Sequence, residues 1–72
     1  MDYDPKIFAA NLRAGRARLD MSQDLLAMAA GISTYSLAAY ESGEQTPGAD
    51  KVSRIAKALG TTPNALLGWP SE

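Results

Sequence analysis

The apolar residues of this chain recur at helical spacing over short stretches. In residues 23–30, Leu26 and Ala30 are four positions apart with Ala27 between them, and a helix that turns about 100° per residue places all three on one face. Gly31 follows, and glycine readily takes the positive φ on which many helices end. The pattern therefore predicts a helix over residues 23–30 that stops at Gly31.

A second helical pattern begins within three residues of this stop. Ser33 stands where the hydroxyl of an N-cap is needed, as Ser22 does for the preceding helix. The second helix is predicted over residues 34–42, and the inward positions beyond the glycine are Ile32, Leu37 and Tyr40. Two short helices joined by so tight a turn are typical of a helix-turn-helix, and equally of an ordinary hairpin in another helical bundle.

Three further helices are predicted around this pair. Asp4-Pro5 opens the first, with aspartate as N-cap and proline at the first helical position, and Thr62-Pro63 opens the last. The apolar positions that share a face are Phe8, Leu12 and Leu19 in the first helix, and Val52, Ile55, Ala56 and Leu59 in the fourth. The five predicted helices cover residues 5–19, 23–30, 34–42, 49–59 and 63–67. The predicted fold class is all-α, with one domain over residues 1–72.

Composition removes several classes of function. The chain of 72 residues contains no cysteine and no histidine, which excludes a disulfide, a zinc finger, a thiol nucleophile and an imidazole base. The longest uncharged stretch, residues 25–40, is too short and polar to span a bilayer, and the acidic N-terminus lacks the features of a secretory signal. We therefore expect a cytoplasmic protein with no membrane association, no metal, no cofactor and no enzymatic activity.

Net charge complicates a nucleic-acid hypothesis. The chain carries a formal charge of −1, with an isoelectric point near 5.2, whereas nucleic-acid binding is usually accompanied by a basic patch. Basic residues nevertheless cluster in two predicted helices, as Arg13, Arg16 and Arg18 in the first and Lys51, Arg54 and Lys57 in the fourth. Each cluster fits an ordinary solvated helix face more simply than a phosphate-binding stripe.

An ordered series of motifs extends over most of the chain. Its members are the L-R-x-x-R-x-x-L spacing of Leu12, Arg13, Arg16 and Leu19, then Ser22-Gln23, Ala27, Gly31 and Ser33, then Tyr40-Glu41-x-Gly43, Pro47, residues 55–60 (IAKALG) and Leu66-Leu67-Gly68. In this order they resemble the DNA-binding domains of the Cro and lambda-type phage repressors, the Xre family. The resemblance runs from Phe8 to Gly68 and implies a compact five-helix lambda repressor-like bundle containing a helix-turn-helix.

The resemblance also implies a DNA-contacting surface. In a helix-turn-helix the second helix enters the major groove, and the family pattern places at the interface Gln23, Ser33, Thr34, Tyr35, Ala38, Ala39, Ser42 and Gln45. Gln23 matches a glutamine that anchors a phosphate and braces the recognition helix. Ser33 is interpreted first as an N-cap, and Tyr35 equally as a base reader or a surface aromatic. Two departures weaken this surface: Ala38 and Ala39 offer only methyl groups, and Glu44-Gln45 replaces a loop that is often basic.

Three more sets of residues are expected to have a role. Arg16 and Glu41 match an ion pair that joins the first helix to the end of the third in family members. Leu67 and Trp69 lie where relatives often dimerise, although Trp69 could instead fold back on its own helix. Leu25 and Met28 lie about 150° from the core face of their helix, so they form either ordinary exposed surface or a patch for a protein partner.

Two functions are compatible with these features of the sequence. The first is a sequence-specific transcriptional regulator, a repressor that binds a two-fold operator in double-stranded DNA as a homodimer. Because 72 residues leave no room for an effector domain, we expect either a small Cro-like regulator or a truncated DNA-binding half. The second is an antitoxin-like or adaptor module, which keeps the fold for protein contact and binds DNA weakly or not at all. An enzyme is not expected, because nothing resembles a paired acid and base or a metal site.

Overall fold

Five helices form the described part of the chain. The structure is a computed structural model that describes residues 2–70, and its helices are α1 (Pro5–Arg18), α2 (Gln23–Ala30), α3 (Thr34–Ser42), α4 (Ala49–Ala58) and α5 (Pro63–Leu67). Within residues 2–70 the fold is all-helical, as predicted. α1 and α4 each end one residue earlier than expected, because Leu19 and Leu59 are the C-cap residues.

Short-range side-chain bonds fix where these helices begin. The Asp4 carboxylate accepts from the Lys6 and Ile7 amides, and the Ser22 hydroxyl accepts from the Leu25 amide at 3.0 Å. Ser33 and Thr62 accept from amides three residues ahead of them in the same way. Each bond satisfies an amide in a first turn that has no partner inside its helix. The caps predicted from the sequence are therefore present.

The turn between α2 and α3 depends on Gly31. Its φ of 70° lies in the left-handed region, where a side chain would be strained, and its amide closes the last turn of α2. The chain can then reverse within Gly31, Ile32 and Ser33 and start α3. These helices and this turn make up the helix-turn-helix.

The core is built from side chains of all five helices. Its largest fully buried side chains are Phe8, Leu12, Leu26, Leu37 and Ile55. α1 also approaches Leu59 closely at Gly15, where an added Cβ would lie 3.1 Å from Leu59 Cδ1. The glycine that weakens α1 as a helix former thus permits this contact. Leu19 was predicted to line the buried face of α1, but it is exposed, since the helix ends at Arg18.

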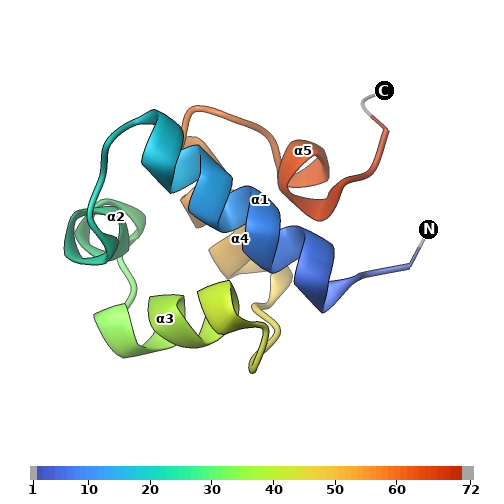
Figure 1. The fold of residues 1–72 in the computed structure, drawn as a ribbon, viewed down its shortest axis with the longest axis horizontal. Coiled ribbons are helices and arrows are strands. Elements are labelled where there is room, and N and C mark those ends of the chain that lie inside the picture. The colour runs from blue at the N-terminus through green and yellow to red at the C-terminus, as the bar shows by residue number, and fades with distance from the viewer. Residues whose placement is uncertain (1, 71–72) are drawn as a thin grey trace.

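The arrangement leaves α3 on the outside of the molecule. α1 crosses the view, α4 lies behind it, α2 and α3 occupy one side, and α5 lies on the other (Figure 1). α2 packs on α4, while α1 packs on both α3 and α5. Among residues 2–70, no helix combines the length and the apolar character needed to cross a membrane.

Candidate nucleic-acid interface

The outer face of α3 presents a short row of exposed side chains. Thr34 and Tyr35 at its start are both exposed, and 77% of the Tyr35 surface is accessible. Ala38 is half-buried and Ser42 is exposed. Ala39 was expected on this face, but only 5% of it is accessible, because it lies among the core-facing residues of α3. Of the residues expected on this face of α3, Thr34, Tyr35 and Ser42 are exposed and Ala38 is half-buried.

The serine and threonine hydroxyl groups along this face are hydrogen-bonded within the protein. Thr34 Oγ1 donates to Asp24 Oδ1 of α2 at 2.9 Å, and Ser42 Oγ donates to the Ala39 carbonyl at 3.0 Å. Ser33 Oγ accepts from the Ser36 amide and also bonds the Ser36 hydroxyl, both at 3.0 Å. Ser33 therefore acts as the N-cap of α3, the first of the two interpretations made from the sequence.

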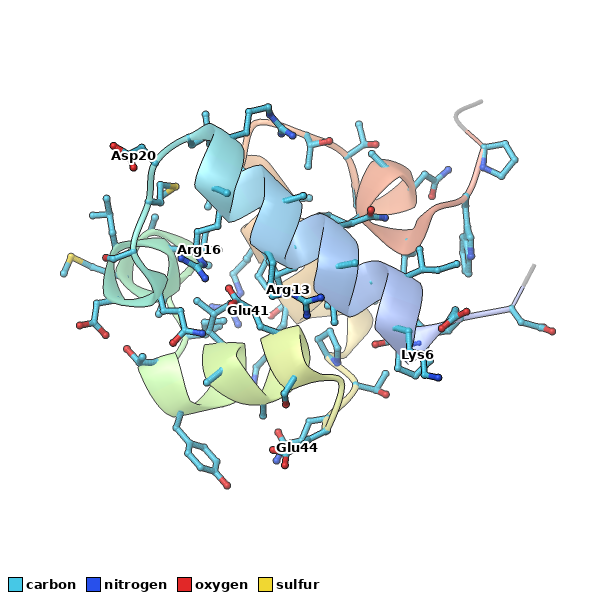
Figure 2. All side chains as sticks on the ribbon, viewed as in Figure 1. Lys6, Arg13, Arg16, Asp20, Glu41 and Glu44 are labelled. Carbon is cyan, nitrogen blue, oxygen red and sulfur yellow. The ribbon has the colours of Figure 1, made fainter. Side chains whose placement is uncertain are left out.

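A charged cluster holds α3 against α1 and the start of α2. Arg16 donates from Nε to Glu41 Oε2 at 2.7 Å and from Nη2 to Glu41 Oε1 at 3.0 Å. Gln23 Nε2 donates to the same Oε1 at 3.0 Å, and Arg16 Nη1 donates to the Met21 carbonyl at 2.9 Å. Figure 2 shows Arg16, Glu41 and Arg13 together between α1 and α3. The cluster brings together three of the site residues expected from the sequence: Gln23, Arg16 and Glu41.

Electrostatics in this cluster favour the ionised pair. Burial of Glu41, which is 4% accessible, raises the pKa of its carboxyl group. Hydrogen bonds from Arg16 and Gln23 and the charges of Arg16 and Arg13 outweigh burial, so the pKa of Glu41 lies below its usual value. The hydrogen bond to Glu41 raises the pKa of Arg16, which favours the charged form of this partner as well. The carboxylate is therefore charged, nearly inaccessible and fully occupied in bracing α3.

Two other arginines bind the carbonyl ends of the helix-turn-helix. Arg13 Nη1 donates to the backbone carbonyl of Glu41 in the last turn of α3. Arg54 Nη1 donates to the carbonyl of Gly31 at 3.2 Å, and its Nη2 pairs with Asp50 at 3.0 Å. Cations are favourable at helix C-termini, where carbonyls lack partners. The two basic clusters were interpreted as solvated faces, but Arg13, Arg16 and Arg54 hold helices together.

The chain segment that contains α2, α3 and the turns beside them carries acidic but no basic residues. Residues 19–50 contain no lysine or arginine, and their acidic residues are Asp20, Asp24, Glu41, Glu44 and Asp50. Glu44 and Gln45 are exposed in the turn after α3, and their amides bond the Ala39 carbonyl at 3.0 and 3.3 Å. Figure 2 shows Glu44 below the end of α3. Sequence reasoning located Glu44 but missed the Asp24 bond to Thr34, since only the packing of α2 on α3 brings the two together.

The ends of the described chain meet beside α5 and form an apolar groove. Trp69 Nε1 donates to the Asp2 carbonyl at 3.2 Å. The groove has a volume of about 380 Å³, and its lining includes Tyr3, Pro47, Val52, Pro63, Leu67 and Trp69. Leu67 and Trp69, expected at a dimer interface, thus share one concave apolar surface. Leu25 and Met28 lie elsewhere, both exposed on α2, with 77% of Met28 accessible.

Two packed helices joined by a three-residue turn, the second of them with an open outer face, define a helix-turn-helix domain of the DNA-binding type. A helix-turn-helix family profile matches residues 12–66. The chain therefore belongs to this family, that of the Xre and lambda repressor-like domains. A search of curated protein sequences gave no match.

Solved structures share the fold. The restriction-modification controller protein C.AhdI from Aeromonas hydrophila is 27% identical with a TM-score of 0.84, and the match covers 88% of this chain and 96% of that one. The DNA-binding domain of the P22 C2 repressor is 27% identical with a TM-score of 0.82, covering 93% and 86%. Hydroxypropylphosphonic acid epoxidase from S. wedmorenis is 31% identical with a TM-score of 0.81, but only 36% of that enzyme is covered. The family and the first two structures indicate a DNA-binding helix-turn-helix fold.

Proposed function

We propose that this protein is a sequence-specific transcriptional regulator, a repressor that binds a two-fold operator as a homodimer with α3 in the major groove. The observation that carries the proposal is the exposed face of α3, held by the Arg16, Gln23 and Glu41 cluster so that its N-terminal residues point outward. Thr34 and Tyr35 are then placed to meet base edges. Kinship with a restriction-modification controller and a repressor domain supports the same function.

The electrostatics predict weak, salt-tolerant binding. The logarithm of the affinity of a protein for DNA falls linearly with the logarithm of the salt concentration. The slope is proportional to the number of phosphates that the protein's cations neutralise. Because residues 19–50 have no lysine or arginine, each subunit neutralises few phosphates at this surface. Gln23, the amides at the start of α2 and the turn carrying Gln45 are the proposed uncharged phosphate contacts.

The homodimer is proposed to form through the groove beside α5. Relatives often pair through this end of the fold, and the groove beside α5 supplies a concave apolar surface. α5 lies on the side of the molecule away from α2 (Figure 1). A two-fold interface uses the same patch on both subunits, so Trp69 and Leu67 of one copy would contact the groove of the other. Aromatic side chains such as Trp69 are the groups most often found at the centre of interfaces.

Binding of labelled duplexes across a salt series tests the function. We expect saturable binding of a selected duplex, with a shallow slope of log affinity against log salt. Glu44→Gln and Ala14→Lys each raise the net charge by one, but Ala14 lies on α1 facing α5. Glu44→Gln should therefore tighten binding more than Ala14→Lys. Absence of saturable binding by the wild type and by Glu44→Lys would rule out the function.

The second candidate, a protein-interaction module, is favoured by the exposed apolar residues of α2. Leu25 and Met28 are three residues apart and therefore neighbours on the helix surface. Leu25→Glu with Met28→Lys should keep the fold, since neither side chain lies in the core. If DNA binding is absent and the double variant loses an association that the parent makes, this second function replaces the first. Retention of every association by the double variant would leave the patch as tolerated surface.

A further inference from the structure

The first residue of α3 has its hydrogen-bonding capacity set by its neighbour on α2. Thr34 Oγ1 donates to Asp24 Oδ1 at 2.9 Å, and both residues are exposed. A carboxylate oxygen can only accept, so the one proton of the Thr34 hydroxyl must point toward Asp24. The lone pairs of Oγ1 remain available. Toward any ligand outside the protein, Thr34 is therefore a hydrogen-bond acceptor and not a donor.

We propose that Asp24 makes Thr34 a reader of exocyclic amino groups, an inference that rests on the proposed function. In the major groove, adenine N6 and cytosine N4 carry amino protons, whereas guanine O6 and N7 and thymine O4 only accept. An acceptor at Thr34 selects adenine or cytosine at its base position and disfavours guanine and thymine. Asp24 is a positioning residue in this scheme, because it sets the direction of the Thr34 proton.

The rest of α3 supplies few donors that could reverse this preference. The Ser42 hydroxyl donates its proton to the Ala39 carbonyl, and the Ser33 hydroxyl donates its proton to Ser36 Oγ. α3 has no lysine or arginine, the side chains that most often read guanine. The helix thus offers acceptors, methyl groups and the Tyr35 phenol. This composition favours an amino-bearing base under Thr34.

Selection of bound sequences from a random duplex library tests the proposal with three variants. Thr34→Val removes the hydroxyl at nearly constant shape, and the base position that loses its preference is the one that Thr34 reads. There the wild type should prefer adenine or cytosine by about fivefold, the factor expected of one hydrogen bond. Thr34→Ser should keep that preference. Asp24→Ala frees the hydroxyl to donate and should admit thymine or guanine at that position only.

Asp20→Asn is the matched control for charge, since it also removes one negative charge but does not contact Thr34. It should leave the preference at every position unchanged. A preference for guanine or thymine at the Thr34 position, or the same preference in Asp24→Ala as in the wild type, would overturn the inference while leaving DNA binding intact. Failure of the wild type to enrich any sequence would instead overturn the proposed function, and the inference with it.

Discussion

Arg16 and Glu41 join α1 to α3 through two hydrogen bonds, but the two side chains are not equally buried. The Glu41 side chain is 4% accessible, whereas the Arg16 side chain is 22% accessible and also binds the Met21 carbonyl. A charge left without its partner costs more when water cannot reach it. Loss of the arginine should therefore harm the fold more than loss of the glutamate.

We expect Arg16→Ala to lower the free energy of unfolding by about 3–5 kcal/mol, because Glu41 would remain charged and buried. Glu41→Ala should cost less, about 1–3 kcal/mol, since Arg16 can turn toward water. Denaturant unfolding measures both, with Arg18→Ala as an exposed control on the same helix. Equal losses would contradict the difference in burial as the cause of the asymmetry. Melting of both variants within a few degrees of the parent would show that the pair does not hold α3.

The depressed pKa of Glu41 makes stability depend on pH in acid. In the folded state the carboxyl group releases its proton at lower pH than in the unfolded chain, so the unfolded state binds more protons in between. The stability from Glu41 is complete above its unfolded pKa of about 4.3 and falls as pH drops through the folded value. The difference in unfolding free energy between the wild type and Glu41→Gln should shrink below about pH 4.3. A constant difference down to about pH 2 would contradict the shift.

Much of the fold follows from local sequence because caps and turn glycines act within a few residues. Ser22, Ser33 and Gly31 mark the ends of α2 and α3, and the structure confirms these boundaries. Ala39 was misplaced because the sequence of α3, TYSLAAYES, has small or apolar residues on every side. Such a helix has no periodicity strong enough to say which alanine faces inward.

The arginines illustrate what the sequence could not predict. Spacing places Arg13 and Arg16 on one helix, but it does not reveal that the last turn of α3 lies against them. Arg16 was paired with Glu41 from the family pattern, whereas the bonds of Arg13 and Arg54 to carbonyls had no signal in composition or period. Contacts between residues far apart in the chain depend on how helices pack, and helix packing is not encoded in any local motif.

Asp20 is the one non-glycine residue with positive φ among residues 2–70, at 55°. Glycine takes such a conformation without steric cost, because it has no Cβ. Asp20→Gly should raise the free energy of unfolding by about 0.5–1 kcal/mol through relief of this strain. Asp20→Val, with a branched Cβ, should lower it. Thermal melts of the two variants against the parent measure both changes, and a glycine variant less stable than the parent would contradict the argument.

Tyr35 should affect DNA binding without affecting stability. Its side chain is 77% accessible, so Tyr35→Ala should change the free energy of unfolding by less than about 0.5 kcal/mol. If Tyr35 reads a base, Tyr35→Ala should lose about 1–3 kcal/mol of binding free energy on the selected operator. On an operator altered at the base that Tyr35 contacts, the same variant should lose little. Competition binding with single-position operator variants provides the measurement, and Tyr35→Phe separates the hydroxyl from the ring. An equal loss on every sequence would mark a backbone contact instead.

Trp69 should control the oligomeric state. Its indole contacts the Asp2 carbonyl and lines the apolar groove, so Trp69→Ala removes both an anchor and part of the surface that the second copy would cover. We expect sedimentation to give a dimeric mass for the parent at operator-binding concentrations and a monomeric mass for the variant. Tyr35→Ala, on the outer face of α3, should remain dimeric.

Trp69→Ala should also bind a two-fold operator more weakly than the dimeric parent does. It should bind a half-site as the parent does, because α3 is unchanged. If Trp69→Ala keeps the mass of the parent, the subunits do not pair through this groove.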